Sequence, residues 1–233
     1  MAHNNNLSDK TALPRAKRNN SNTHCVSSSV MRRMPRYFRY LRNLLNNDVL
    51  RISSGDLAKL MNITPSQVRQ DFNSFGDFGQ QGYGYNVKYL YTQVSRILCV
   101  NKKFPAIIIG SGDMAKALLA STLFNIRGVR IVGVFSPNKD DVGKECSAFT
   151  VRHTDEIKEF CNTCDVSIAV YALPELYDGE LCRNLSECGI KGLWNFSVCE
   201  ISSEFIKCEN LMMGDSLMLL MYEVGKEVRE DGN

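Results

Sequence analysis

The 233-residue sequence contains no uninterrupted apolar run near the ~18 residues that a membrane-spanning helix requires. No apolar stretch typical of a secretory signal follows the first residues. The nine cysteines are scattered through a chain of moderate size, which favours free thiols in a reducing compartment over a disulfide framework. We therefore expect no membrane partner and a cytoplasmic location.

Histidine is scarce, which limits metal binding and acid–base catalysis. The three histidines, His3, His24 and His153, lie at no spacing typical of zinc ligands, and the C-x-x-C pair of Cys161 and Cys164 has no second pair to complete a site. We therefore predict no metal site and no catalytic residue. Structural, buried thiols are the favoured interpretation of Cys161 and Cys164. Disulfide redox chemistry is the alternative, because four more cysteines follow in the same region.

Acidic residues are rare in the first part of the chain. Residues 1–100 contain 14 Lys and Arg against 5 Asp and Glu, a net charge of +9, whereas residues 101–233 contain 14 against 20, a net charge of −6. The overall charge of +3 therefore conceals a basic first part and an acidic second part. This asymmetry predicts a polyanionic partner for the first part alone.

The segment 53–85 contains two short helical patterns and then a glycine-rich stretch. The first pattern follows Ser53, a typical helix N-cap. The second begins with Thr64 as its cap and Pro65 in the first helical position, and apolar residues recur at helical spacing until Gly76. This arrangement is typical of a winged helix-turn-helix, whose second helix lies in the major groove of double-stranded DNA. The alternative is an ordinary helical hairpin within a core.

The regions on either side of this segment complete the first domain. Residues 1–33 are rich in Asn, Ser and Thr with a few basic residues, which predicts a disordered basic arm. Such an arm either adds nonspecific affinity for DNA or is an inert tail. Amphipathic helices are predicted over 35–46, opening at Pro35, and over 87–98. We assign residues 34–100 to the winged helix-turn-helix.

The pattern changes at Phe104 to an alternation of strands and helices. Apolar runs predict strands from 104 and over 129–135, 166–172 and 191–196, and helical stretches over 114–125, 154–162 and 175–188 lie between them. Alternating β and α units predict a Rossmann-like doubly wound parallel sheet over 101–213.

A glycine-rich turn follows the first of these strands. Gly110, Gly112 and Ala115 form a G-x-G-x-x-A pattern where the strand gives way to a helix. Gly110 permits the tight turn, Gly112 lets the backbone approach a pyrophosphate, and Ala115 allows close packing of helix on strand. The alternative is a glycine turn that binds no ligand. An acid that would hold the adenosine ribose is absent, because the second strand ends at Ser136.

The last pattern covers residues 214–233. Leu217, Leu220, Met221 and Val224 form an apolar stripe on a helix that is too apolar to stand alone. This helix either packs on its own sheet or is exchanged with a second subunit.

Several motifs together resemble the Rex family of bacterial redox-sensing transcriptional repressors. They are PRYFRYL, RISSGDLAKLMNITPSQVRQDF, SFGDFGQQGYGYNV, GSGDMAKALL and GIKGLWNF, and the resemblance covers roughly residues 34 to 225. It implies a homodimer with an N-terminal winged helix, a Rossmann-like domain and a swapped C-terminal helix at 214–233. It also implies that the protein binds NAD(H). The protein would bind palindromic operator DNA when NADH is low and release the DNA when NADH binds.

The resemblance also assigns roles to individual residues. DNA contacts are expected at Thr64, Ser66, Gln67, Arg69, Gln70, Ser74, Gln80, Gln81, Tyr83 and Tyr85. Cofactor contacts are expected at Gly110, Ser111, Gly112, Asp113, Met114, Ala115, Ser136, Pro174, Asn195 and Phe196. Arg42 and Asp215 match residues that link the two domains in relatives.

The chain departs from the family at the cofactor side. Family members usually have an acid at the position of Ser136, and Ser121 and Ser216 also replace larger side chains. Loss of a ribose carboxylate costs on the order of 1.5–3 kcal/mol. We therefore expect the NADH response to be weakened. Alternatives are a Rex-like regulator with another effector or cysteine redox sensing, and an NAD(P)-dependent oxidoreductase.

Overall fold

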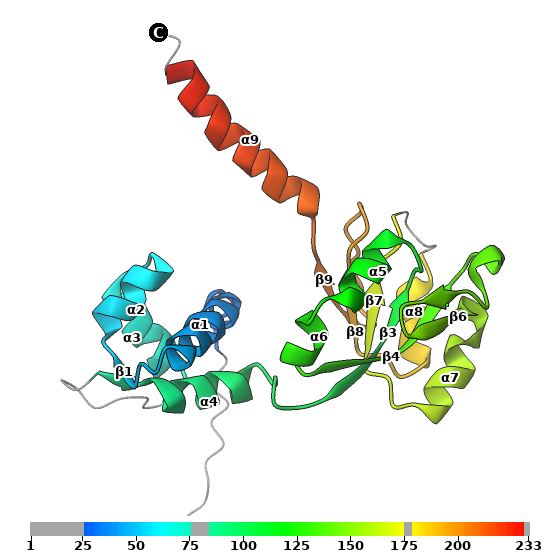
Figure 1. Ribbon diagram of the computed structural model, residues 1–233, viewed down its shortest axis with the longest axis horizontal. Coiled ribbons are helices and arrows are strands. Elements are labelled where there is room, and N and C mark those ends of the chain that lie inside the picture. The colour runs from blue at the N-terminus through cyan, green and yellow to red at the C-terminus, as the bar shows by residue number, and fades with distance from the viewer. Residues whose placement is uncertain (1–25, 76–83, 175–178, 231–233) are drawn as a thin grey trace, which may run out of the picture. The chain divides into compact units, whose positions relative to one another are not determined.

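The computed structural model describes residues 26–75, 84–174 and 179–230, and the chain divides into two compact units, Met1–Val94 and Ser95–Asn233 (Figure 1). We expected the division near residue 100, after the helix over 87–98. The two compact units divide after Val94, within α4 (Val87–Ile97), whose Leu90 and Val94 are fully buried.

The first unit is a small helical domain, and its described residues include one pair of short strands. Its elements besides α4 are α1 (Ser28–Asn46), β1 (Arg51–Ile52), α2 (Ser54–Met61), α3 (Pro65–Asn73) and β2 (Tyr85–Asn86). The strands pair antiparallel, with Ile52 opposite Tyr85. Met34, Leu57 and Val68 come from three different helices and are each fully buried. The packing confirms the helix-turn-helix expected from the sequence.

The first helix begins earlier than the sequence suggested. We expected it to open at Pro35 and the arm to extend to residue 33, but α1 starts at Ser28, and Pro35 lies inside it. Ser27 caps the helix by accepting a hydrogen bond from the Val30 amide. Val30 and Met34 are buried one turn apart and extend the apolar face of the helix. This burial outweighs the helix-breaking tendency of Pro35.

The caps of α2 and α3 form as the sequence predicts. The Ser53 hydroxyl accepts from the Asp56 amide at 3.0 Å, and the Thr64 hydroxyl accepts from the Gln67 amide at 3.1 Å. Asn62 takes the left-handed conformation, with φ of 51°, and turns the chain between the helices. This tight turn fixes the angle at which α3 leaves α2.

The second unit is a seven-stranded sheet covered by helices. Its strands are β3 (Phe104–Ile109), β4 (Val129–Ser136), β5 (Glu145–Cys146), β6 (Phe149–His153), β7 (Ile168–Tyr171), β8 (Gly192–Asn195) and β9 (Lys207–Asn210). Its helices are α5 (Asp113–Ala120), α6 (Leu123–Ile126), η1 (Lys139–Asp141), η2 (Thr154–Glu156), α7 (Ile157–Thr163), α8 (Leu181–Glu187) and α9 (Met213–Glu230).

The strand order confirms a doubly wound sheet. It runs β5-β6-β4-β3-β7-β8-β9, and every pair is parallel except β5 with β6. The chain forms β3 to β6 on one side of the sheet, with β5 at the edge, and then β7 to β9 on the other side. The carboxyl ends of β3 and β7 therefore border the crevice in which such sheets bind ligands.

Alternating side chains of β3 face the two layers of helices. Ile107 and Ile109 pack in a cluster with residues of α7 and α8, and Ile108 packs in a cluster with residues of α5 and α6. β5, β6 and β9 were not predicted, because they are short and each contains at most one buried residue. The predicted helix over 175–188 is shorter, with α8 beginning at Leu181, and residues 175–178 lie outside the described chain.

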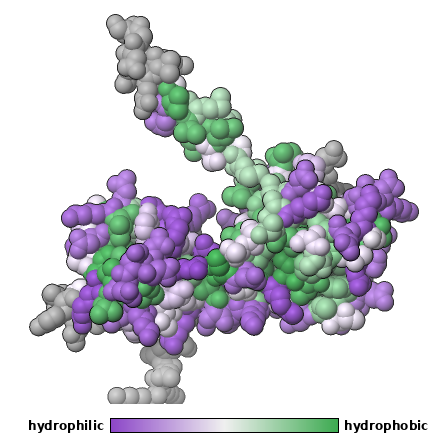
Figure 2. Space-filling view, in the orientation of Figure 1, coloured by the Kyte–Doolittle hydropathy of each residue, from purple (hydrophilic) through white to green (hydrophobic). Residues whose placement is uncertain are grey.

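The last helix, α9, exposes its apolar residues. Leu217, Leu220 and Val224 are 51–59% exposed in the single chain. Figure 2 shows hydrophobic residues along this helix. The alternative that α9 packs on its own sheet is therefore wrong for this chain taken alone.

None of the helices in the described ranges is both long and apolar enough to cross a membrane.

Candidate functional site

Helix α3 presents a polar face to solvent. Thr64, Ser66, Arg69 and Gln70 are exposed, and Gln67 is half-buried. The opposite face is apolar, with Val68 and Phe72 buried at 0% and 1% exposure. The amphipathic pattern therefore leaves the expected DNA-reading side chains accessible.

Hydroxyl groups from two helices hold the side chain of Arg69. Its Nη1 donates to the Ser54 hydroxyl at 3.0 Å, and its Nη2 donates to the Ser66 hydroxyl at 3.1 Å. No described carboxylate forms an ion pair with it. The guanidinium group is thus oriented at the start of both helices and keeps its charge available for a phosphate or a guanine.

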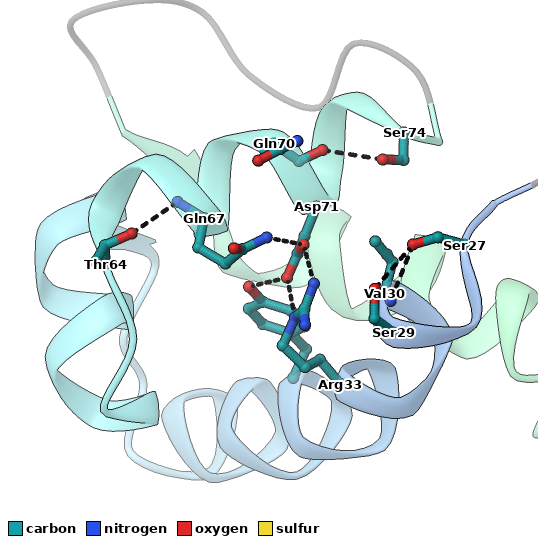
Figure 3. Close-up of polar contacts among 10 residues, drawn as sticks. Ser27, Ser29, Val30, Arg33, Thr64, Gln67, Gln70, Asp71 and Ser74 are labelled. Carbon is teal, nitrogen blue, oxygen red and sulfur yellow. Dashed lines mark hydrogen bonds and ion pairs between the residues drawn. The ribbon is translucent and has the colours of Figure 1, made fainter.

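A buried carboxylate joins α3 to α1, and sequence reasoning missed it. Asp71 is fully buried and accepts two hydrogen bonds from Arg33, from Nε and Nη2, each at 2.7 Å. The Tyr37 hydroxyl donates to it at 2.9 Å, and Gln67 Nε2 donates at 2.8 Å. Figure 3 shows the carboxylate of Asp71 between Arg33 and Gln67. One side chain therefore orients a residue of the reading face and ties its helix to α1.

Hydrogen bonds favour the ionised form of the Asp71 carboxylate. Burial of Asp71 disfavours its charged form, but hydrogen bonds from Arg33, Gln67 and Tyr37 outweigh burial, so that the pKa of Asp71 lies below its ordinary value. Burial, with the hydrogen bond to Asp71, raises the pKa of Tyr37. The charged pair therefore persists at neutral pH.

A polar groove of about 530 Å³ lies between the first turn of α1 and the exposed face of α3. Ser27, Ser29 and Arg33 line it from α1, and Gln67, Gln70 and Ser74 line it from α3. The Ser74 hydroxyl donates to the Gln70 carbonyl at 3.0 Å (Figure 3). The early start of α1 therefore adds hydroxyl groups beside the residues expected to contact DNA.

The expected wing contacts lie mostly outside the described residues. Gln80, Gln81 and Tyr83 fall in the gap between 75 and 84. Tyr85 is half-buried in β2, with its ring centroid 5.3 Å from that of Phe72. Burial raises the pKa of Tyr85. Its ring therefore packs against the buried Phe72 of α3.

The glycine-rich turn of the second unit has the geometry that a dinucleotide needs. Gly110 has φ of 122°, and a Cβ there would lie 2.8 Å from the carbonyl oxygen of Ala172. A Cβ at Gly112 would meet nothing within 4 Å. No side chain caps the N-terminus of α5, and Ala115 is fully buried behind it. The turn thus offers open space and free amide groups to a pyrophosphate.

A carboxylate that sequence reasoning missed lies beside this turn. Asp141 Oδ2 accepts from the Ser111 hydroxyl at 2.9 Å and from the Ser136 hydroxyl at 3.1 Å. Hydrogen bonds from Ser111 and then Ser136 hold the pKa of Asp141 below its ordinary value. Because Ser111 and Ser136 follow β3 and end β4, the Asp141 carboxylate lies at the carboxyl edge of the sheet.

The other expected cofactor residues occupy varied environments. Asp113 is exposed and pairs with Lys116 at 3.6 Å, Met114 is half-buried, and Pro174, three residues after the end of β7, is exposed. The amide of Asn195 is fully buried and is used by the protein itself. It donates to Cys199 and Asn210 and accepts from Ser197.

Phe196 contributes its ring to the same edge. It is half-buried and lies 4.4 Å from the ring of Trp194. Contacts between these residues and a cofactor stay predictions. Arg42 and Asp215 belong to different units, so the expected link between them also stays a prediction.

The Cys161 thiol has the character of a structural thiol. All described cysteines are free, and burial raises the pKa of Cys161 to about 11. Little of the Cys161 thiol is ionised at neutral pH when its pKa is raised in this way, which disfavours rapid disulfide chemistry.

Among the residues that the structure describes, no group of three or more His, Cys, Asp or Glu is arranged to hold a metal ion.

Both units match known protein families, and relatives of known description match the chain over both units. Residues 25–73 match the family described as putative DNA-binding protein N-terminus, and residues 101–199 match the CoA binding domain family. The redox-sensing transcriptional repressor Rex of Caldicellulosiruptor saccharolyticus is 44% identical over 206 residues, which cover 88% of this chain and 94% of that protein. The chain belongs to the Rex family.

Solved structures of a Rex relative agree with this assignment. The crystal structure of RSP in complex with β-NAD⁺ and operator DNA has a TM-score of 0.80 and 37% identity, and covers 89% of this chain and 96% of that one. The structure of RSP in complex with β-NADH has a TM-score of 0.78 and 34% identity, with 89% and 98% covered. The expectation of a Rex family fold is thus confirmed over both units.

Proposed function

We propose that this chain is a redox-sensing transcriptional repressor that binds operator DNA through α3 and senses NAD(H) at the glycine-rich turn. The observation that supports this most is the pairing of an exposed, carboxylate-free reading face with an open dinucleotide turn in one chain of the Rex family. The RSP relative has structures with both kinds of ligand. Function as a sensor fits better than catalysis, because His153, the single described histidine, is used as a helix cap.

The first unit supplies the DNA contacts in this proposal. Arg69 and Gln70 point outward from α3, and the first 100 residues have a net charge of +9. Phosphate contacts position such a domain, and side chains on the exposed face of the helix then contact base edges. Ser27 and Ser29 at the start of α1 provide further donors for a phosphate that lies in the polar groove.

The second unit supplies the cofactor site. The free amides at the start of α5 and the open space at Gly112 fit a pyrophosphate. When bound, the nicotinamide cofactor reports the redox state of the cell through its affinity difference between reduced and oxidised forms. Gly110 keeps the turn close to β7, where any side chain would collide with Ala172.

A homodimer completes the proposal. The exposed Leu217, Leu220 and Val224 of α9 need a partner surface, and exchange of α9 between two copies would bury them. Two winged helices related by a two-fold axis fit a palindromic operator.

The function is tested by mixing the full chain with a pool of palindromic duplexes and following complexes by gel shift. We expect a salt-sensitive complex that forms with NAD⁺ or without dinucleotide and dissociates when NADH is added. A protein that binds none of the duplexes at low salt, or whose complexes ignore NADH, would contradict the proposal.

Replacement of Arg69 by glutamine is expected to weaken operator binding. The guanidinium group contributes one positive charge at the reading face, so R69Q should reduce the slope of log K against log salt concentration by about 1. Affinity measured by fluorescence anisotropy at several salt concentrations gives this slope. The matched control is K59Q, which removes an exposed charge on α2 beside Asp56 and should leave the slope unchanged. Equal slopes for R69Q and K59Q would place Arg69 outside the interface.

A further inference from the structure

The second strand of the sheet ends without the acid that such folds use to hold a ribose, and its serine does not substitute. Ser136 is 1% exposed. Its hydroxyl accepts from the Asn138 amide at 3.2 Å and donates to Asp141 at 3.1 Å. Both of these partners belong to the protein, so the Ser136 hydroxyl has little capacity left for a ligand.

Asp141 brings a carboxylate to the same place from a different element. It ends η1, five residues beyond Ser136. Its Oδ2 bridges the hydroxyl at the end of β4 and the hydroxyl of Ser111, which lies between the two glycines of the turn. The carboxylate therefore spans the glycine-rich turn and the end of the second strand, where a Rossmann fold binds the adenosine ribose.

The carboxylate is partly exposed, and its second oxygen forms an ion pair with a lysine. Asp141 has a side-chain exposure of 31%, and its Oδ1 lies 3.7 Å from Nζ of the exposed Lys144. The two serine donors hold the pKa of Asp141 below its ordinary value, so the group is ionised at neutral pH. The site thus presents a fixed, charged acceptor to solvent at the edge of the dinucleotide turn.

We propose that Asp141 binds the ribose diol of the adenosine half of the cofactor and selects NAD(H) over NADP(H). An ionised carboxylate accepts hydrogen bonds from both ribose hydroxyls and repels a phosphate at the 2′ position. This inference rests on the proposed function, because it assumes that a dinucleotide binds at this turn. It also replaces the expectation of a weakened site, because the carboxylate missing at position 136 is supplied by position 141.

The same contacts allow a competing interpretation, which the experiment separates. A carboxylate bonded to Ser111 would also act as an internal anion that a pyrophosphate must displace. In that case removal of the charge would improve dinucleotide binding, whereas removal of a ribose acceptor would weaken it. The direction of the change in affinity therefore distinguishes the two roles.

The test is calorimetric titration of the full-length wild type, D141N and D140N with NADH and with NADPH. We expect the wild type to bind NADH more tightly than NADPH, and D141N to raise the dissociation constant for NADH on the order of tenfold. D141N should leave the NADPH constant unchanged or lower it, because the repulsion is gone. D140N is the matched control, since Asp140 is the exposed neighbouring carboxylate, and it should change neither constant by more than about twofold.

The outcomes separate this inference from the function on which it rests. Unchanged or tighter NADH binding by D141N, with the wild type binding NADH, overturns the role of Asp141 alone. Failure of the wild type to bind either dinucleotide overturns the proposed function as well. A thermal melt without ligand checks folding. If D141N is unfolded, S136A serves instead: it removes one donor that holds Asp141, and an unchanged NADH affinity would contradict the proposal.

Discussion

Replacement of Asp71 by asparagine is expected to destabilise the first unit by about 3 kcal/mol, since removing one partner of a buried ion pair leaves the other uncompensated. Asp71 is fully buried, and Arg33, Tyr37 and Gln67 all donate to it. An asparagine has nearly the same shape but accepts fewer hydrogen bonds and has no charge for Arg33. Since domains are stable by only about 5–15 kcal/mol, this loss is large.

The stability difference should be measured by urea unfolding of the full chain. Circular dichroism follows the helices of both units, whereas the fluorescence of Trp194, the chain's single tryptophan, follows the second unit alone, so a shift seen only by circular dichroism reports the first unit. We expect D71N to lower the midpoint of the circular dichroism transition and to leave the fluorescence transition in place. D48N is the matched control, because Asp48 is exposed and its φ of 56° suits asparagine. Coincident curves for D71N and wild type would show that the pair contributes nothing to stability.

The contribution of Asp71 also has a defined pH dependence. Its pKa in the folded protein lies below the unfolded value near 3.8, so its contribution is fully present above the unfolded pKa and is lost as the pH falls through the folded pKa. The difference in unfolding free energy between wild type and D71N should therefore stay constant above about pH 5 and shrink below about pH 4. A difference that shrinks near neutral pH would contradict this assignment.

Replacement of Leu220 by aspartate is expected to convert the proposed dimer into monomers and to weaken operator binding on the order of 100-fold. Leu220 is 59% exposed in the single chain, within a helix whose described leucines, methionines and Tyr222 are all exposed. A charge at a buried dimer surface loses its hydration without gaining a partner. A monomer binds each half-site separately and loses the gain in effective concentration.

Sedimentation velocity and operator anisotropy together test this second prediction. L220D should sediment as a monomer and bind a palindromic duplex no more tightly than a single half-site. K226Q is the control on the same helix, because the exposed Lys226 pairs within α9 itself, with Glu223 at 3.2 Å and with the ring of Tyr222 at 4.4 Å from its centroid. A dimeric L220D with unchanged operator affinity would show that α9 is not the dimer surface.

Much of the first unit could be predicted because its signals are local. Thr64 and Pro65 mark the start of α3, and each acts within one helical turn of itself. The start of α1 was misplaced because Pro35 is a strong local signal for a helix start. The burial of Val30 and Met34, which depends on packing against other helices, outweighed it.

The partners of Asp71 could not be predicted for the same physical reason. Asp71 and Arg33 are 38 residues apart, and neither residue has a pattern that identifies the other. On the sequence alone, Asp71 is a single acid in a helix whose one other charged residue is Arg69. Only the crossing of α3 over α1 shows that it is the residue that fixes Gln67 and Arg33 in place.

The sequence by itself determined the two units, the doubly wound sheet and the glycine-rich turn, because caps, apolar periodicity and glycine conformation act over a few neighbouring residues. It predicted that no acid stands where a Rossmann fold binds the ribose, since Ser136 ends β4. The tertiary structure alone decided that Asp141 lies there, because the parallel pairing of β3 with β4 brings Ser111 within 2.9 Å of a residue 30 positions away. Side-chain hydrogen bonds between loops depend on strand order, which no local pattern encodes.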